Sequence, residues 1–361
     1  MIKKGLCAFV SIGLFALVFL GPQSALAQDV NVKPAKFKVS SAFPPPGASM
    51  VSEVMMFWQQ EVTKRTKGAI TFETFWGGAL GVPAEHVELI KRGTADVAQA
   101  DEWYTPGRFP LSEFEFIFPF GPTDPVLMGK AMRKILEEFP EFKRDETREK
   151  VVLIAFAPGG EYMFLSKKPL RSVNDFKGEK VSLIGRYLGK WMPPGASAVV
   201  RPGQERYDLL RTGVVNIDLL TYDLHHAFKT YEQTKYCVKA RILSPCFGTV
   251  LMSLDTFNRY PPEVQKIFME AGKQAEINQA TNVSPKWWER IQKEWAAKGI
   301  EFIDFPEAER QKWVDSLSDI PAEWANDFEA KGYPAFKMVQ RWQEITSELG
   351  FKWIRKWGIK K

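Results

Sequence analysis

Residues 89–98, LIKRGTADVA, decide the predicted fold because they join two kinds of element. The segment ends a helix expected over residues 83–92, and Gly93 stands where a helix C-cap needs a left-handed residue. A short buried strand is expected to follow over residues 97–100. A helix that turns at a glycine into an apolar strand is typical of α/β lobes.

The sequence on both sides continues this alternation of short apolar runs and amphipathic segments. Upstream, we expect a strand over 36–40, a helix over 49–66 and a strand over 70–75. Residues 104–125 are rich in Pro, Gly and Phe, and a loop is expected there. The other elements expected are helices over 128–139, 204–211 and 262–298, strands over 151–155, 180–184, 198–200 and 219–222, strand signals within 241–254, and a mostly helical region over 321–357.

The N-terminus has the pattern of a secretory signal peptide. Two lysines precede an apolar run over 6–20, and Ala25-Leu26-Ala27 supplies the small residues that signal peptidase needs. We expect cleavage after Ala27, a mature chain that starts at Gln28, and a periplasmic location. A retained membrane anchor is the alternative, but a spanning helix needs ~20 apolar residues, and this run breaks at Gly21-Pro22.

Length and charge limit the function classes. Removing 27 of the 361 residues leaves 334, a length that exceeds the size of one hydrophobic core and suggests two lobes. The formal net charge is +6, but Lys and Arg form no run longer than two between residues 28 and 358. Charges of both signs alternate instead, so nucleic acid is not an expected partner.

Cysteine and histidine usage gives no cofactor or metal signature. Cys237 and Cys246 could form a disulfide in an oxidising compartment if a tight hairpin joined them, and two buried thiols are the alternative. Neither cysteine has the spacing of a redox motif, and the three histidines lack metal-ligand spacing. We therefore expect no metal and no cofactor.

Short segments in a fixed order carry a resemblance to a known family. They are FWGGALG (75–81), LIKRGTADVA (89–98), YTPGRFPL (104–111), PLRSVNDFKG (169–178), PGQERY (202–207), LRTGVVN (210–216) and YPPEVQ (260–265). In this order they resemble the extracytoplasmic solute receptors of tripartite ATP-independent periplasmic (TRAP) transporters, as a divergent member of the dicarboxylate-receptor family. The resemblance covers roughly residues 35–275.

The resemblance implies an α/β, two-lobed periplasmic binding protein fold with a hinged cleft and a long helix spanning both lobes. We assign residues 28–155 and 245–270 to lobe I, and residues 156–244 and 271–361 to lobe II, with C-terminal helices packing across both. The chain is expected to cross between lobes near 155–161 and 235–244, and Pro285 predicts a kink in the long helix.

The resemblance also implies a function that needs no catalysis. A receptor of this kind captures a small organic solute, here expected to be an organic acid, and delivers it to the membrane permease subunits of a TRAP transporter. We expect a monomer. The sequence shows no Gly-x-Ser-x-Gly elbow, His-Glu-x-x-His pair or P-loop. A periplasmic enzyme of unknown reaction and a receptor that presents its ligand to a sensor are the alternatives.

One departure from the family concerns the ligand. These receptors commonly carry Lys-x-Arg-x-Pro after the Lys-Gly approach, and the arginine grips a substrate carboxylate in bidentate fashion. Residues 178–184 read GEKVSLI, so Ser182 occupies the place of the arginine. Two accounts stay open: Arg186 supplies the cation from a shifted position, or the ligand is not a simple carboxylate and is held by aromatic side chains and neutral hydrogen bonds.

The candidate site residues follow predicted strands, because ligands of open α/β sheets lie beyond the carboxyl ends of strands. Acids beside aromatics could hold a cationic or polyhydroxylated ligand, whereas the alternative makes them solvated acids beside a packed core. Besides Arg186 and Ser182, the candidates are Asp101, Trp103 and Tyr104 after one strand, Tyr222 and Asp223 after another, Tyr207 facing them, and Phe43 and Phe247 as apolar walls.

Overall fold

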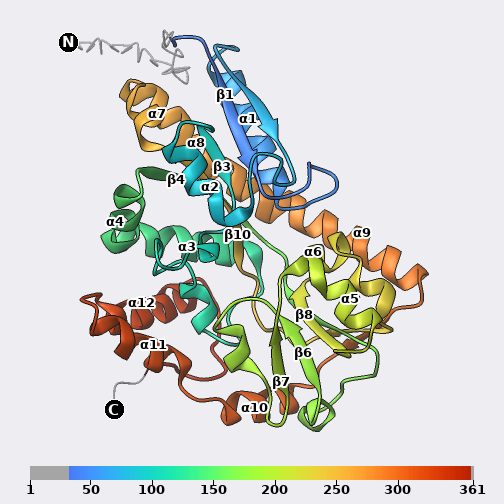
Figure 1. Ribbon diagram of the computed structural model, residues 1–361. Coiled ribbons are helices and arrows are strands. Elements are labelled where there is room, and N and C mark those ends of the chain that lie inside the picture. The colour runs from blue at the N-terminus through green and yellow to red at the C-terminus, as the bar shows by residue number, and fades with distance from the viewer. Residues whose placement is uncertain (1–31, 359–361) are drawn as a thin grey trace, which may run out of the picture. The chain divides into compact units, whose positions relative to one another are not determined.

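A computed structural model describes residues 32–358 of the chain, and the predicted signal peptide lies outside them. The described chain is mixed α/β with two separate sheets, one of five strands and one of six (Figure 1). None of its helices within residues 32–358 has the length and apolar character that crossing a membrane requires.

The first sheet has the strand order β2-β1-β3-β10-β4. β1 pairs in parallel with β2 and β3, whereas β10 is antiparallel to both β3 and β4. The strands are β1 (Ala35–Ser41), β2 (Ile70–Phe75), β3 (Val97–Gln99), β4 (Val151–Pro158) and β10 (Cys246–Ser253). The helices and 3₁₀ turns that connect them are α1 (Ser52–Arg65), η1 (Pro83–Glu85), α2 (His86–Lys91), η2 (Glu102–Tyr104), η3 (Phe114–Ile117), α3 (Pro125–Glu138), α4 (Pro140–Arg148) and α7 (Leu254–Asn258).

The second sheet has the order β11-β9-β5-β8-β6-β7, with β5 antiparallel to its neighbours β8 and β9. Its strands are β5 (Tyr162–Ser166), β6 (Lys180–Leu183), β7 (Ser197–Val200), β8 (Ile217–Thr221), β9 (Tyr236–Lys239) and β11 (Glu301–Asp304). Between them lie η4 (Val173–Phe176), η5 (Leu188–Trp191), η6 (Gly203–Glu205), α5 (Arg206–Arg211), α6 (Tyr222–Ala227) and η7 (Thr230–Gln233).

The predicted helix–glycine–strand turn is confirmed. Helical residues run from Pro83 to Lys91, Gly93 has φ +70°, and β3 begins four residues later. The same turn recurs where α5 leads through Gly213, at φ +75°, into β8. Only glycine adopts this backbone conformation without strain, which fixes the direction in which each strand begins.

Two strand connections carry the chain from one sheet to the other. β4 of the first sheet leads through Gly159-Gly160 into β5 of the second, and β9 of the second leads through residues 240–245 into β10 of the first. Both lie where the sequence predicted the crossings. The two-lobed fold is therefore confirmed, while the residue boundaries assigned to each lobe stay a prediction.

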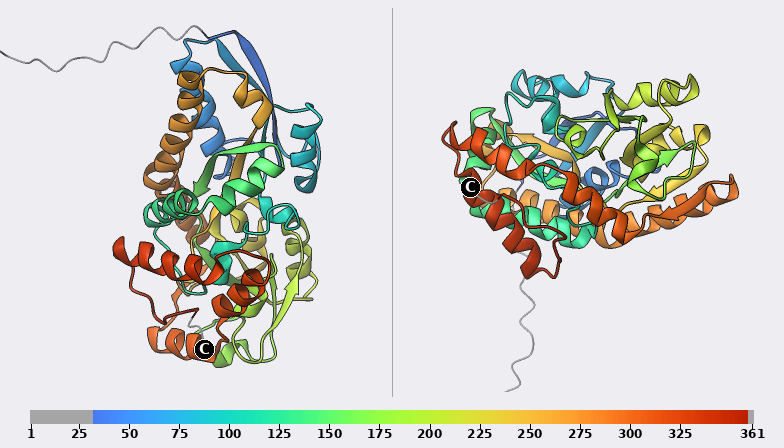
Figure 2. Two further views of the ribbon diagram at one scale, coloured as in Figure 1. Left: turned by 90° about the vertical axis from the view of Figure 1, so that its left-hand side faces the viewer. Right: turned by 90° about the horizontal axis from the view of Figure 1, so that it is seen from below.

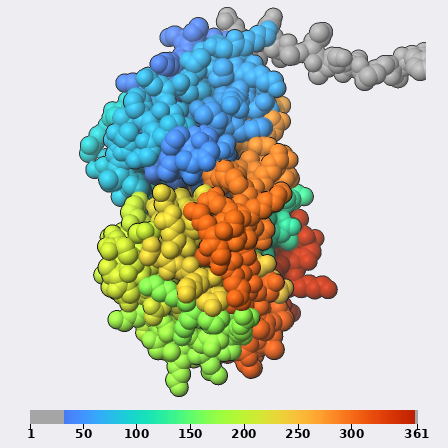
Figure 3. Space-filling model, turned by 90° about the vertical axis from the view of Figure 1, so that its right-hand side faces the viewer, coloured from blue at the N-terminus to red at the C-terminus, as the bar shows by residue number. Residues whose placement is uncertain are grey.

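A long helical stretch contacts both sheets. α8 (Pro262–Asn278) packs against α1 and β4, and α9 (Ser284–Ala297) packs against α6 of the second lobe. Between them, Gln279–Val283 forms a π-helical turn directly before Ser284-Pro285, which is the kind of interruption that proline causes. In Figure 3 the orange residues of this stretch border both the blue N-terminal part of the chain and the yellow-green segment.

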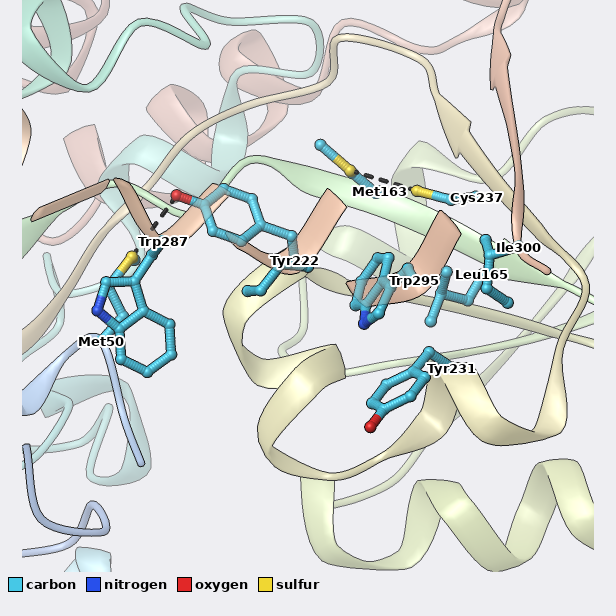
Figure 4. Packing of buried hydrophobic residues seen from close by; sticks show 10 residues of the cluster. Met50, Met163, Leu165, Tyr222, Tyr231, Cys237, Trp287, Trp295 and Ile300 are labelled. Atoms are coloured by element: carbon cyan, nitrogen blue, oxygen red, sulfur yellow. Dashed lines mark hydrogen bonds between the residues drawn. The ribbon is translucent and has the colours of Figure 1, made fainter. Parts of the chain in front are cut away.

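α9 anchors a core of large side chains on the second sheet. Figure 4 shows Trp295 beside Leu165 of β5 and Tyr231 of η7, with Met163 and Cys237 above them in this view. The rings of Tyr231 and Trp295 stack with centroids 5.5 Å apart. Burial of such aromatic area dominates core energetics, so α9 is held firmly to the second lobe.

The C-terminal helices cover the junction near α3. α10 (Glu307–Ser316) buries Trp313 against the second sheet, while α11 (Ile320–Glu329) and α12 (Ala335–Glu348) pack on η3 and α3 (Figures 1 and 2). Phe114 of η3 lies edge-on to both Trp324 and Trp342, at 5.4 and 5.7 Å. Phe114 thus anchors the predicted loop over 104–125 by packing against the tryptophans of α11 and α12.

A substitution at Gly272 tests the contact between α8 and β4. A Cβ atom at this position would lie 2.2 Å from the carbonyl oxygen of Ile154. We expect Gly272→Ala to lower the free energy of unfolding by about 1–3 kcal/mol, as overpacking does in other cores, measured by urea unfolding. Gly189→Ala is the control, because its Cβ would meet only Ala198 at an ordinary 3.6 Å. Equal stability of the two variants would contradict the contact.

Candidate ligand-binding site

Aromatic side chains from both lobes meet at a small hollow. Its volume is about 10 Å³, and its walls come from the 3₁₀ turns of the first lobe and from β5 and the segment after β6 in the second. The lining residues are Trp103, Glu113, Phe116, Tyr162, Ile184, Gly185, Tyr187 and Leu188. A mostly apolar concave site with a few polar groups is what small-molecule pockets look like.

The rings around the hollow form one cluster. Trp103 lies edge-on to Phe116 and Phe247, with centroids 5.2 and 5.1 Å apart. Tyr162 contacts the same two phenylalanines at 6.3 and 6.2 Å. Of the predicted aromatic residues, Trp103 lines the hollow and Phe247 is buried beside it. Tyr104 is 39% exposed and does not line the hollow, although its ring centroid lies 6.4 Å from that of Trp103.

Two carboxyl groups are fixed to the backbone on either side of Phe247. Asp101 Oδ1 accepts a hydrogen bond from the Gly248 amide at 2.5 Å, and both oxygens of Glu115 accept from the Cys246 amide, at 2.9 and 3.1 Å. Burial raises the pKa of Asp101 to about 7, and it raises the pKa of Glu115 well above its ordinary value. Glu115 was not among the predicted site residues.

Asp223 approaches the same region from the second lobe. It lies at the start of α6, directly against the crossing glycine, because a Cβ added to Gly160 would lie 2.5 Å from its Oδ1. Burial raises the pKa of Asp223 to about 6, partly offset by the nearby Thr221 hydroxyl and the first amides of α6. Its charge also raises the pKa of Asp101, so the two predicted acids interact electrostatically.

Ser182 does not face the hollow but belongs to a buried charge network. Its hydroxyl donates to Asp218 Oδ1 at 2.5 Å, and Arg206 Nη1 donates to the same oxygen at 2.6 Å. All three side chains are fully buried. Burial alone would raise the pKa of Asp218, but Arg206, with His225 and Ser182, holds it below its ordinary value.

Arg206 is the main residue that sequence reasoning missed. Nη1 also donates to the Leu219 carbonyl at 2.9 Å, yet Nε and Nη2 have no acceptor among the described residues. The signal was present in PGQERY (202–207), because the resembling family segment, Pro-x-x-Glu-Val-Tyr, carries an aliphatic residue where this chain carries Arg206.

Arg186 is engaged at the surface of the protein. Its guanidinium pairs with Glu113 at 3.2 Å and lies over the ring of Tyr187, 4.5 Å from the ring centroid. The side chain is 56% exposed. It therefore stands beside the hollow, already paired, rather than inside it.

The three remaining candidates lie in packed or outward positions. The hydroxyl of Tyr222 donates to the Ser284 carbonyl at 3.0 Å within the core of Figure 4. The Tyr207 hydroxyl accepts a hydrogen bond from Gln233 at 2.8 Å in a partly buried position. Phe43 lies beside Gly248 in the first lobe, 3.6 Å from the place of a Cβ there. None of these three lines the hollow among the described residues.

The two cysteines of the second half are not linked. Cys237 and Cys246 are both free and buried, in strands of different sheets. The Cys237 thiol lies 3.5 Å from the sulfur of Met163 (Figure 4). Of the two alternatives that the sequence left open, the structure has the buried thiols.

Comparison with known proteins decides the family. The model of bacterial extracellular solute-binding proteins, family 7, matches residues 41–327. The chain belongs to this family. A monocarboxylate 2-oxoacid-binding periplasmic protein of Nostoc is 23% identical over 309 residues, which is 82% of this chain and 80% of that protein.

Solved structures share the fold at low identity. A TRAP solute-binding protein of Rhodoferax ferrireducens, in complex with copurified benzoate, superposes with a TM-score of 0.74 at 22% identity and covers 87% of this chain and 98% of its own. A TRAP periplasmic protein of Bordetella bronchiseptica with bound mandelate gives 0.72 at 23%, covering 88% and 100%. These neighbours confirm the periplasmic binding protein fold of this divergent member.

Proposed function

We propose that this solute-binding protein captures a small organic acid at the hollow between its lobes and delivers it to the permease subunits of a TRAP transporter. The observation that carries the proposal is the family match over residues 41–327, joined to an aromatic site at the lobe junction. The related proteins named above bind 2-oxoacids, benzoate or mandelate. The protein acts as an exported monomer, without catalysis, after cleavage of residues 1–27.

Hinge motion explains how a solute enters a site lined from both sides. The crossing segments at Gly159-Gly160 and residues 240–245 join the lobes, and opening there would separate Trp103 from Tyr162. Closing on a solute would bury it, as in periplasmic binding proteins generally. No covalent step is required for this cycle.

A thermal-shift screen of the purified mature chain tests the function. Benzoate, mandelate, pyruvate and a wider set of acids, amines and sugars serve as probes. A compound that binds only the folded state stabilises it by RT ln(1 + [L]/Kd), about 2.7 kcal/mol at one hundred times Kd. We expect at least one stabilising compound that is recovered unchanged after hours with the protein. Conversion to a product would support the enzyme instead, and no stabilisation by any class would contradict the receptor.

A further inference from the structure

Four buried hydrogen-bond donors on three residues have no acceptor among the described residues. They are Nε and Nη2 of Arg206, the hydroxyl of Tyr162 and Nε1 of Trp103. Arg206 and Tyr162 are fully buried, and Trp103 and Tyr162 line the hollow. A buried donor without an acceptor loses the hydrogen bond that it would make with water, which destabilises the unliganded protein. A ligand with acceptor oxygens, such as a carboxylate, would satisfy several of the donors at once.

The guanidinium of Arg206 occupies the neighbourhood of the missing family arginine. Ser182 stands at that arginine's place in the sequence, and both side chains bind one oxygen, Oδ1 of Asp218. Ser182 of β6 and Arg206 of α5 therefore meet at one carboxylate oxygen. The planar fork of Arg206 keeps two nitrogens available for bidentate recognition.

Carboxyl groups surround the same tyrosine. Burial raises the pKa of the Tyr162 hydroxyl well above its ordinary value; Arg206 opposes this, while Glu115, Asp101 and Asp223 add to it. The positions of these acids are consistent with their effect on Tyr162. Asp101 and Glu115 bind backbone amides on either side of Phe247, whose ring centroid lies 6.2 Å from that of Tyr162. Tyr162 pairs with Thr221, which lies two residues before Asp223. Arg206 is already paired with Asp218 at 2.6 Å, and it forms no ion pair with these three acids.

Aromatic faces lie beside these acids. Trp103, Phe116 and Phe247 form the wall next to Asp101 and Glu115. Ring faces attract cations, and the attraction grows when the cation is desolvated. Two of the unpartnered donors, on Trp103 and Tyr162, thus line the aromatic hollow, and the buried acids act electrostatically on Tyr162.

We propose, on the basis of the function above, that the solute is an organic acid that also carries a positively charged nitrogen, such as an amino acid or a betaine. Arg206 and Tyr162 bind its carboxylate, so Arg206 replaces the family arginine absent at Ser182. The carboxylates of Asp101 and Asp223 bind its cation beside Trp103.

Compounds that share a carbon frame but differ in charge test the ligand class. Isothermal titration compares phenylalanine with 3-phenylpropionate and 2-phenylethylamine, proline with cyclopentanecarboxylate and pyrrolidine, and leucine with 4-methylpentanoate and 3-methylbutylamine. We expect one of the three amino acids to bind at least about 10-fold more tightly than both of its singly charged analogues. Equal or tighter binding of the plain acids would overturn the inference and leave the proposed function intact. No binding in any set would count against both.

Variants at two positions test the role of Arg206. Arg206→Val should weaken binding of the best amino acid at least about 100-fold, whereas Arg211→Val, on the exposed side of the same helix, should change it less than about 3-fold. The double variant Ser182→Arg/Arg206→Val places the arginine where the family has it and should recover affinity to within about 10-fold of the unmodified protein. Circular dichroism verifies that each variant is folded.

Each result of the variant series decides the role of Arg206. If Arg206→Val stays folded and keeps its affinity, Arg206 does not bind the carboxylate. If the double variant is folded but does not recover binding, the two arginine positions are not equivalent, which also overturns the replacement. If Arg206→Val does not fold, Arg206→Lys is tested instead. Lysine cannot form the two parallel hydrogen bonds of a guanidinium. If Arg206→Lys binds the amino acid as tightly as the unmodified protein does, the inference is overturned.

Discussion

Asp218→Asn should lower the free energy of unfolding by about 3–5 kcal/mol, because it leaves the fully buried guanidinium of Arg206 without its counter-charge. The two atoms that form the pair, Arg206 Nη1 and Asp218 Oδ1, are 2.6 Å apart, and both side chains are 0% exposed. A buried ion pair adds little net stability when intact, but an unpaired buried charge is expensive. Urea unfolding followed by circular dichroism, with comparison of midpoints at constant slope, measures the loss.

An ion pair between two exposed residues of α5, the helix that carries Arg206, is a matched control. Asp208 and Arg211 are 2.9 Å apart, but their side chains are 68% and 57% exposed. Water screens this pair, so Asp208→Asn should change stability by less than about 1 kcal/mol. The double variant Arg206→Met/Asp218→Leu removes both buried charges and should regain most of the stability lost in Asp218→Asn. If Asp218→Asn lowers the free energy of unfolding by less than about 1 kcal/mol, Arg206 does not depend on Asp218 for its counter-charge, and the prediction is wrong.

The regular elements were predictable because their patterns are local. β2 spans Ile70–Phe75, as expected from its alternation, and the glycine turns at 93 and 213 place β3 and β8. β5 was missed, because all five of its residues are buried and it shows no alternation. β9 and β11 were also missed, and their pairing joins residues more than sixty positions apart. Periodicity carries no information of that kind.

The site was predictable only where it lies next to a strand end. Asp101, Trp103 and Asp223 follow β3 and β8, so the rule that ligands lie beyond carboxyl ends found them. Glu115 is held by the Cys246 amide, a contact 131 residues apart in sequence, and nothing local announces it. The sequence shows Arg206 as an arginine in a position that is aliphatic in the family. Its role became apparent only from the structure, in which Ser182 and Arg206 both donate to Oδ1 of Asp218.

The stability of the unliganded protein should fall as pH rises from 5 to 8. Burial raises the pKa of Asp101 to about 7, of Asp223 to about 6, and of Glu102 and Glu161 to about 8 and 7. In this range the folded state holds protons that the unfolded state has released, so the free energy of unfolding decreases with pH. For Asp101 alone the loss between pH 5 and 7 is about 2 kcal/mol.

Urea unfolding at pH 5, 6, 7 and 8 measures this slope. The double variant Asp101→Asn/Asp223→Asn should flatten it, because two of the groups that release protons are gone. Asp208→Asn should keep the slope of the unmodified protein, because its side chain is 68% exposed. Constant stability over this range in the unmodified protein would mean that these acids are hydrated in solution.

The same protons connect stability to the ligand. A solute that carries a positively charged nitrogen favours the ionised forms of Asp101 and Asp223, so its affinity should increase between pH 6 and 8. The limit is about tenfold per pH unit for each proton released on binding. A plain acid meets growing repulsion over the same range, so its affinity should decrease. The sign of the pH dependence therefore separates the two ligand classes without any substitution, and it follows from acids that the fold buries at the junction of its lobes.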